Sequence, residues 1–184
     1  MIESLLGFLF GKNMRISWFI IVLVVLFTLE LTGPVREYFI IPFTGLLATI
    51  SAFITQLFDP NVISHGIILQ DSVSRIAVSI QPGCNGIEAM ICLTAAIIAF
   101  PAHWKSKLYG LFFGFLAIQA LNIVRIISLF YLLQWNKEWF EWAHLYLWQA
   151  LIILDALIVF IIWVRMLPED EEDDGENQTL APQT

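Results

Sequence analysis

The sequence predicts an all-α polytopic membrane protein, a helix bundle of four to five spans with one small extracytoplasmic hairpin. Three observations predict this fold class. The chain is 59% hydrophobic and 14% charged, with a mean hydropathy of +0.79, whereas roughly a quarter of the residues in soluble domains are charged. Its apolar residues form long runs, and one segment between the runs alternates like a strand. A soluble fold would need a larger core than a chain of this size encloses.

Two apolar runs occupy the first third of the chain. Residues 16–31 predict a spanning helix, slightly short against the ~20 residues usually needed, and no small-residue cleavage site follows, which favours an uncleaved anchor. Residues 39–58 are long enough to cross but contain Pro42 and several Thr and Ser. Lys12 and Arg15 indicate a cytoplasmic N-terminus. That orientation leaves residues 39–58 as the candidate for an interfacial or re-entrant helix.

Residues 59–83 differ in kind from the apolar runs around them. Polar residues and short apolar stretches mix in this segment, which is typical of strands outside the bilayer. The stretch "RIAVSIQ" alternates, so a strand would separate its apolar side chains from the others. The apolar set is Ile76, Val78 and Ile80, and the opposite set is Arg75, Ala77, Ser79 and Gln81. We therefore expect a small hairpin there.

Three further spans are expected at about residues 85–101, 107–133 and 140–165. Lys and Arg in short loops mark the cytoplasmic side of a membrane protein. The loop "HWKSK" and Arg165 are therefore expected in the cytoplasm. The Trp-rich loop at the other end then lies at the outer interface, and Cys84 is expected on that same outer side.

The charge distribution divides the chain into a membrane-embedded domain, residues 1–166, and a C-terminal tail, residues 167–184. Seven of the sixteen acidic residues fall within residues 168–177. Because the tail is polar, acidic and free of aromatic residues, we expect it to be disordered, on the cytoplasmic side. The membrane part is nearly neutral, and no basic stripe indicates a nucleic-acid partner.

Ionisable side chains within the bilayer are costly and mark candidate functional sites. Arg125 lies eight residues before the end of its predicted span, about 12 Å below the outer end, and Asn122 sits one turn earlier. Gly110 and Gly114 lie near the same side of that helix, and small residues let a second helix approach closely. Arg125 is therefore expected to face the protein interior.

The last predicted span carries two more such groups. His144 lies about a turn below the Trp-rich interface, and Asp155 follows eleven residues later. Asp155 either holds a structural hydrogen bond or orients the site. A structural interpretation also exists for Arg125, which would then neutralise Glu88, one turn inside Cys84.

Cys84 lies between Gly83 and Gly86 at the expected start of the third run. A helix N-terminus favours an anion, so this placement predicts a lowered thiol pKa, and the glycines permit a sharp turn and a close backbone approach. Cys92 is eight residues further on, about 12 Å along a helix, whereas a disulfide needs Cα atoms within roughly 7 Å. We interpret Cys92 as a small hydrophobe.

A thiol, a guanidinium and an imidazole thus share the outer side of the membrane. This set suits acyl transfer, in which a thiolate attacks a carbonyl, an imidazole moves protons and a guanidinium stabilises the oxyanion. We predict that the Cys84 sulfur lies within roughly 4–7 Å of both the Arg125 guanidinium and the His144 ring. Taken singly, Cys84 also fits a packed hydrophobe, and His144 fits an interfacial packing residue.

Three stretches set these residues in a recognisable order: "GCNGIEA" around Cys84, "LNIVRI" around Arg125, and His144 at the outer start of the last span. Over about residues 45–150 the sequence resembles the exosortase/archaeosortase family of membrane-embedded cysteine transpeptidases. The short length and the stretch "GCNGIEA" resemble the exosortase H type. Asn85 stands where Cys-Ser-Gly or Cys-Thr-Gly is commoner in the family, which leaves its role open.

This resemblance implies a multi-pass enzyme of the bacterial cytoplasmic (inner) membrane, with its active site facing the extracytoplasmic side. Its partners would be exported proteins with a C-terminal sorting signal: a short motif, a transmembrane helix and a basic end. The enzyme would cleave near the motif and transfer the protein to a cell-surface acceptor, often alongside exopolysaccharide production, with no cofactor or metal. By resemblance Cys84 is the nucleophile, Arg125 the transition-state stabiliser and His144 the acid/base. From their positions in the sequence, we expect five supporting residues: Asn122, Gly83, Gly86, Glu88 and Asp155.

Two other functions stay open at this stage. A small transporter or channel subunit would explain Arg125, Asp155 and Glu88 in the membrane, and it predicts a continuous polar path through the bilayer. A non-catalytic scaffold for envelope assembly is the other, and it predicts a thiol of ordinary reactivity at Cys84.

Overall fold

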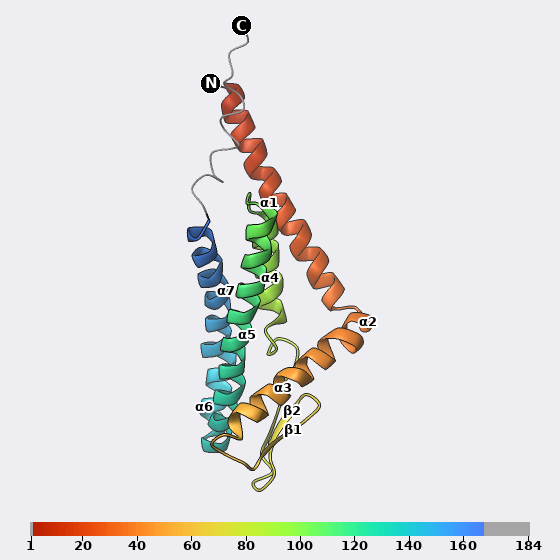
Figure 1. Ribbon diagram of the computed structural model, residues 1–184, viewed down its shortest axis with the longest axis vertical. Helices are drawn as coiled ribbons and strands as arrows, with labels where there is room; N and C mark the ends of the chain where they lie inside the picture. The colour runs from red at the N-terminus through yellow and green to blue at the C-terminus, as the bar shows by residue number, and fades with distance from the viewer. Residues whose placement is uncertain (1, 168–184) are drawn as a thin grey trace.

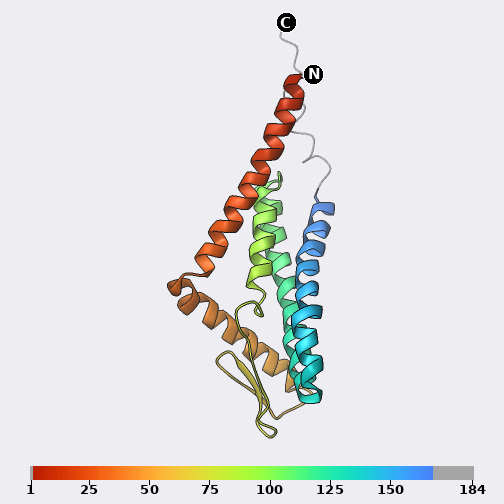
Figure 2. The same cartoon turned by 180° about the vertical axis from the view of Figure 1, so that it is seen from behind.

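A computed structural model describes the backbone of residues 2–167 and the side chains of residues 14–167. The protein is an elongated helix bundle with one small sheet at the end remote from the start of the chain (Figures 1 and 2). Apart from Leu167, the predicted acidic tail lies outside the described residues. The elements in chain order are α1 (Ile2–Glu30), α2 (Gly33–Val35), the π-helical turn η1 (Arg36–Ile40), α3 (Ile41–Thr55), β1 (Val62–His65), β2 (Ile68–Asp71), β3 (Ala77–Ser79), α4 (Ile87–Ala99), α5 (Trp104–Trp135), α6 (Lys137–Trp142), the π-helical turn η2 (Ala143–Leu147) and α7 (Trp148–Arg165).

Helices α4, α5 and α7 pack together along their lengths, and α1 packs against α4 (Figures 1 and 2). The chain reverses between α5 and α6 at Asn136, whose extended backbone ends α5. The Asn136 side chain accepts hydrogen bonds from the backbone N–H groups of Glu138 (2.8 Å) and Trp139 (3.3 Å). This N-cap satisfies groups that a helix start leaves unpaired. Helices α6 and α7 then continue through η2 back along α5.

Three helices of the described chain are long and apolar enough to cross a membrane: Gly33–Thr55, Trp104–Trp135 and Lys137–Arg165. The run predicted as a span at 85–101 forms a helix of only 13 residues, shorter than the ~20 that a crossing needs. Pro101 explains its end, because a residue before proline is pushed out of the helical region, and Phe100 is extended. The number of spans, four to five, stays a prediction.

The segment predicted as a hairpin is a three-stranded antiparallel sheet, ordered β1-β2-β3. Val62, Leu69 and Ile80 are buried and pack, with residues of α3 and α5, into one core cluster. The predicted alternation is confirmed around β3, since Ser79 and its neighbours on the other face are exposed while Ile80 is buried. The buried face of the sheet packs on α3 and α5, and this packing fixes the position of β3, the strand that leads to Cys84.

The glycines of α5 permit the close packing that the sequence predicted. A Cβ at Gly110 would overlap the indole of Trp163 on α7. A Cβ at Gly114 would lie 2.5 Å from the Leu93 side chain of α4. The small residues of α5 therefore accept side chains from two neighbours, and Arg125 on the same helix is buried, with 1% of its surface exposed.

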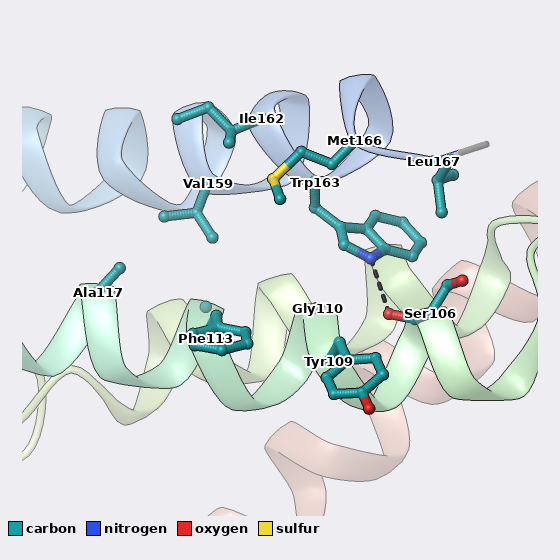
Figure 3. A pocket seen from close by; sticks show the side chains of 11 residues that line it. Ser106, Tyr109, Gly110, Phe113, Ala117, Val159, Ile162, Trp163, Met166 and Leu167 are labelled. Atoms are coloured by element: carbon teal, nitrogen blue, oxygen red, sulfur yellow. Dashed lines mark hydrogen bonds between the residues drawn. The ribbon is translucent and has the colours of Figure 1, made fainter. Parts of the chain in front are cut away.

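A groove of about 650 Å³ opens between α5 and α7 (Figure 3). Figure 3 shows Trp163 lying across it, with its Nε1–H donating to the Ser106 carbonyl at 2.9 Å. Its other lining residues are nearly all apolar, and several of them, including Tyr109 and Phe113, are largely exposed. The groove contains none of the residues that the sequence singles out for chemistry.

Candidate active site

Cys84 lies in a tight turn between β3 and α4. The turn closes through a hydrogen bond from the Cys84 N–H to the Gln81 carbonyl at 2.9 Å. Gly83 and Gly86 adopt φ values of 86° and 76°, in the left-handed region that glycine enters without strain. At Gly86 a Cβ would also lie 2.9 Å from the Gln119 side chain. The glycines thus serve the predicted sharp turn, whereas the group that comes close at Gly86 is a side chain and not the predicted backbone.

Arg125 projects from α5 onto this turn. Its Nη1 donates to the Gly83 carbonyl at 3.3 Å, and its Nη2 donates to the Cys84 sulfur at 3.4 Å. The Nε–H is buried and has no hydrogen-bond partner among the described residues. Within residues 14–167 no ion pair joins Arg125 to Glu88, so the structural pairing considered from the sequence is not formed. The guanidinium therefore presents its charge to the thiol, and Nε is its one nitrogen without a partner among the described residues.

His144 reaches the same sulfur from η2, at the start of the last long helix. Its Nε2 lies 3.9 Å from the Cys84 sulfur, and its ring stacks on Phe140 with centroids 5.7 Å apart. The other ring nitrogen, Nδ1, is buried without a partner in the described chain. A π-helical turn carries His144, and such turns are frequent at functional sites. The stacking fixes the ring plane beside the thiol.

The three side chains meet, at 3.4 and 3.9 Å from the sulfur, somewhat closer than the 4–7 Å that we predicted. A cavity of about 140 Å³ adjoins them, which we call the site cavity. Three further segments complete its wall: β3 with the two residues after it, α5 and α6. The residues are Val78, Ser79, Ile80, Gln81, Ile126, Leu129 and Phe140. A reacting group in this cavity would contact the thiol, the guanidinium and the imidazole together.

A buried polar network holds the Cys84 turn in place. Asn85 is fully buried, and its Nδ2 donates to the Thr44 hydroxyl of α3 at 3.2 Å. Its Oδ1 accepts from the Ile87 N–H at 3.1 Å, and its carbonyl accepts from Gln119 of α5 at 3.2 Å. Buried polar groups that are satisfied in this way fix a unique geometry. Asn85 thereby joins the turn to two helices, which gives a role to the position that the sequence left open.

The family model of transmembrane exosortases (Exosortase_EpsH) matches residues 1–163. The chain belongs to the transmembrane exosortase family. No curated protein and no solved structure matches it. Membership of the exosortase family suggests a membrane-embedded sorting transpeptidase. The narrower resemblance to the exosortase H type and the catalytic roles of the three residues stay predictions.

The pKa of the Cys84 thiol in this exosortase shifts in the direction opposite to the one predicted from its sequence. Burial raises the pKa of the Cys84 thiol above its usual value, and the carboxylate of Glu88 acts in the same direction. The Arg125 guanidinium and the backbone hydrogen bond to Gln81 lower the pKa, but by less. Cys84 also precedes the first helical residue, Ile87, by three positions, so it does not sit in the first turn of α4. The predicted lowering of the thiol pKa was therefore wrong, and a base is needed to take the thiol proton.

Two supporting residues predicted for the exosortase lie outside the cluster. Glu88 is half-buried on α4, where its side chain lies near that of Glu30 on α1. Asp155 is buried on α7, eleven residues after His144, which is about 16 Å along the helix axis. Neither lines the site cavity. Asn122 is buried in the polar network, where its Nδ2 donates to Gln119 at 3.3 Å.

Sequence reasoning missed Thr44, Gln119 and Phe140 as parts of the site. Thr44 and Gln119 are polar residues inside apolar runs, a signal that was visible but shared with several other Thr, Ser and Gln residues. Phe140 gave no signal, because one aromatic residue among many at an interface looks like an anchor. Gln119 lies one turn before Asn122 on α5, so the pair could have been read together with Arg125 as one polar stripe.

Proposed function

We propose that this exosortase is a cysteine transpeptidase that cleaves the C-terminal sorting signals of exported proteins and transfers them to a cell-surface acceptor through a thioacyl-enzyme. One observation carries the proposal. The Cys84 sulfur has a guanidinium nitrogen at 3.4 Å and an imidazole nitrogen at 3.9 Å beside a cavity. The three groups come from three separate segments of the chain, so helix packing rather than sequence neighbourhood brings them together.

In the first half-reaction the sulfur of Cys84 attacks the scissile carbonyl carbon while Nε2 of His144 takes the thiol proton. The carbonyl π electrons move to oxygen, and the guanidinium of Arg125 stabilises the resulting oxyanion. When the tetrahedral intermediate collapses, the C–N bond breaks and His144 returns the proton to the leaving amine. The products are a thioester on Cys84 and the released C-terminal fragment.

In the second half-reaction a nucleophile on the acceptor attacks the thioester carbonyl. His144 takes the proton of this nucleophile, Arg125 again stabilises the oxyanion, and the C–S bond breaks. The sulfur leaves as a thiolate and recovers the proton from His144. Because burial raises the pKa of the Cys84 thiol, His144 has to take the thiol proton in the first half-reaction and to supply a proton to the departing thiolate in the second.

The setting of the reaction follows from the same proposal. The enzyme would be a multi-pass protein of the bacterial cytoplasmic membrane, with Cys84 facing the extracytoplasmic side. A substrate anchored by its own transmembrane helix would present the residues just outside the bilayer to the site. Because the membrane anchor would hold the scissile bond at one depth relative to the bilayer, the bond and Cys84 would lose less positional entropy when they meet.

The transporter or channel function receives no specific support from the geometry. It needs a polar path that joins Arg125 to Asp155, yet Arg125 is engaged by the Cys84 turn. Asp155 lines neither the site cavity nor the α5–α7 groove. The scaffold function differs from the enzyme in one measurable way, since it predicts no acyl transfer to Cys84.

The proposal is tested by Cys84→Ala in cells that express a tagged exported reporter. The reporter ends in a sorting tail from the same genome, with a short extended segment, one transmembrane helix and a basic end. We expect the wild-type enzyme to shorten the reporter and release it from its membrane anchor, and Cys84→Ala to leave it at full length. Immunoblots of the tag in membrane and released fractions measure both events.

Cys92→Ala is the matched control, because Cys92 is exposed on α4 and contributes nothing to the site cavity. We expect this variant to process the reporter as the wild type does. Processing of the reporter at the wild-type rate by Cys84→Ala would end the proposal.

A further inference from the structure

The small sheet has a free edge beside the site cavity. β3 pairs with β2 on one side only, whereas the other edge strand, β1, packs against α3. Val78 and Ser79 of β3 and the two residues that follow line the same cavity as Cys84. An unpaired edge is a template for another strand, and proteins usually cover it unless it has a use. This edge is open where the proposed chemistry takes place.

The hydrogen-bond pattern shows which backbone groups of β3 point outward. Ile80 donates to the Ile67 carbonyl at 2.9 Å, and the Ile76 carbonyl accepts from Asp71 at 3.0 Å, so the even-numbered residues face β2. Successive residues of a strand point their N–H and C=O groups in opposite directions. The groups of Ser79 therefore point away from β2, and no hydrogen bond to them occurs in the described chain.

The backbone groups that point away from β2 lie on a segment that continues directly into the Cys84 turn. The carbonyl of Gln81, two residues after Ser79, accepts the Cys84 N–H at 2.9 Å. The free edge and the nucleophile are thus parts of one continuous backbone segment. A strand laid along this edge would have its backbone guided toward the sulfur.

We propose that this edge binds the extended segment of the substrate as an added β-strand, and so aligns the scissile carbonyl with Cys84. The inference rests on the proposed function and adds the mode of substrate recognition. Strand addition uses backbone hydrogen bonds for affinity, and pockets for alternate side chains supply specificity. Here the site cavity, walled by Ile126, Leu129 and Phe140, receives one apolar side chain of the substrate.

A proline substitution at Ser79 tests the edge without breaking the sheet. Ser79→Pro removes an N–H that faces outward, and proline is tolerated on an edge strand when that N–H is not used in the ladder. Ser79→Ala keeps the N–H and sets the baseline, because both variants lose the hydroxyl that accepts from Gln81 at 2.8 Å. We expect Ser79→Pro to process the reporter about 2- to 10-fold more slowly, in kcat/KM, than Ser79→Ala. Equal rates for the two variants would contradict the inference.

Disulfide trapping gives a second measurement that needs no catalysis. Ser79→Cys is placed in a chain that also carries Cys84→Ala and Cys92→Ala, and the reporter receives single cysteines along its extended segment. On paired strands, directly opposite side chains on one face lie about 4.5–5.5 Å apart at Cβ, so we expect cross-links at every second reporter position. Cross-links without this alternation would overturn the inference. So would a reporter-independent link between two Ser79→Cys chains, which would assign the edge to a second copy.

The two measurements separate this inference from the proposed function. Processing by the wild type without alternating cross-links leaves the transpeptidase standing and rejects the edge as its binding site. Alternating cross-links without processing reject the transpeptidase and support the edge as a peptide-binding strand. If Ser79→Pro fails to accumulate in the membrane, the cross-linking pattern alone decides.

Discussion

Replacing Arg125 with lysine removes the geometry of the guanidinium while keeping its charge. Arg125 is 1% exposed and donates at once to the Gly83 carbonyl (3.3 Å) and to the Cys84 sulfur (3.4 Å), and its Nε–H has no partner in the described part of the chain. A lysine ammonium is a point donor on a flexible stem and cannot span both partners as the planar fork does. We expect kcat for reporter processing to fall about 100- to 1,000-fold, the range seen when one oxyanion donor is removed, with a smaller change in KM.

The assay is a time course of reporter cleavage with purified enzyme in detergent or vesicles, at several reporter concentrations. Arg75→Lys is the matched control, because it makes the same chemical change at an exposed residue between β2 and β3 that does not line the site cavity. Alkylation of Cys84 by iodoacetamide, measured in parallel, reports whether the thiol is still accessible. Cleavage by Arg125→Lys at the rate of the control would refute the oxyanion role.

Three further predictions concern the turn and its thiol. Thr44→Val removes the hydroxyl that accepts from Asn85, so we expect reporter cleavage to slow about 2- to 10-fold, whereas Thr44→Ser retains the hydroxyl and should recover most of that rate in the same assay. Gly86→Ala forces a side chain into φ 76° against a neighbouring amide, so we expect it to lower stability by about 1–3 kcal/mol, seen as a lower midpoint of thermal unfolding in detergent, and an unchanged midpoint would contradict the strain. Because burial raises the pKa of Cys84, its alkylation rate should keep rising with pH beyond the ~8.5 of an ordinary thiol, and Arg125→Ala should move the rise to still higher pH. A plateau of that rate below pH ~8.5 in the wild type would show a low-pKa thiolate instead.

The membrane character and the meeting of the three side chains followed from the sequence for physical reasons. A guanidinium cannot be left facing lipid, so Arg125 had to point inward, and the glycines on its helix indicated a close neighbour. The strand alternation around Ser79 was equally clear, because one face of the sheet had to be buried.

Other features depend on tertiary contacts that no local pattern encodes. The bond between Asn85 and Thr44 joins residues 41 positions apart, and only the packing of α3 beneath the turn creates it. The pKa of Cys84 depends on how deeply the turn is buried, which outweighed the helix start that the sequence suggested. The π-helical turn that carries His144 has no sequence marker.

The most direct test of the account is a search for the thioester on Cys84. Purified enzyme and reporter are mixed, quenched in acid during turnover, digested, and the peptide that contains Cys84 is examined by mass spectrometry. We expect an added mass equal to the reporter residues on the acyl side of the cut, on Cys84 and not on Cys92, and its loss on treatment with hydroxylamine. Cleavage of the reporter with no acyl group on Cys84 at any time point would contradict the account.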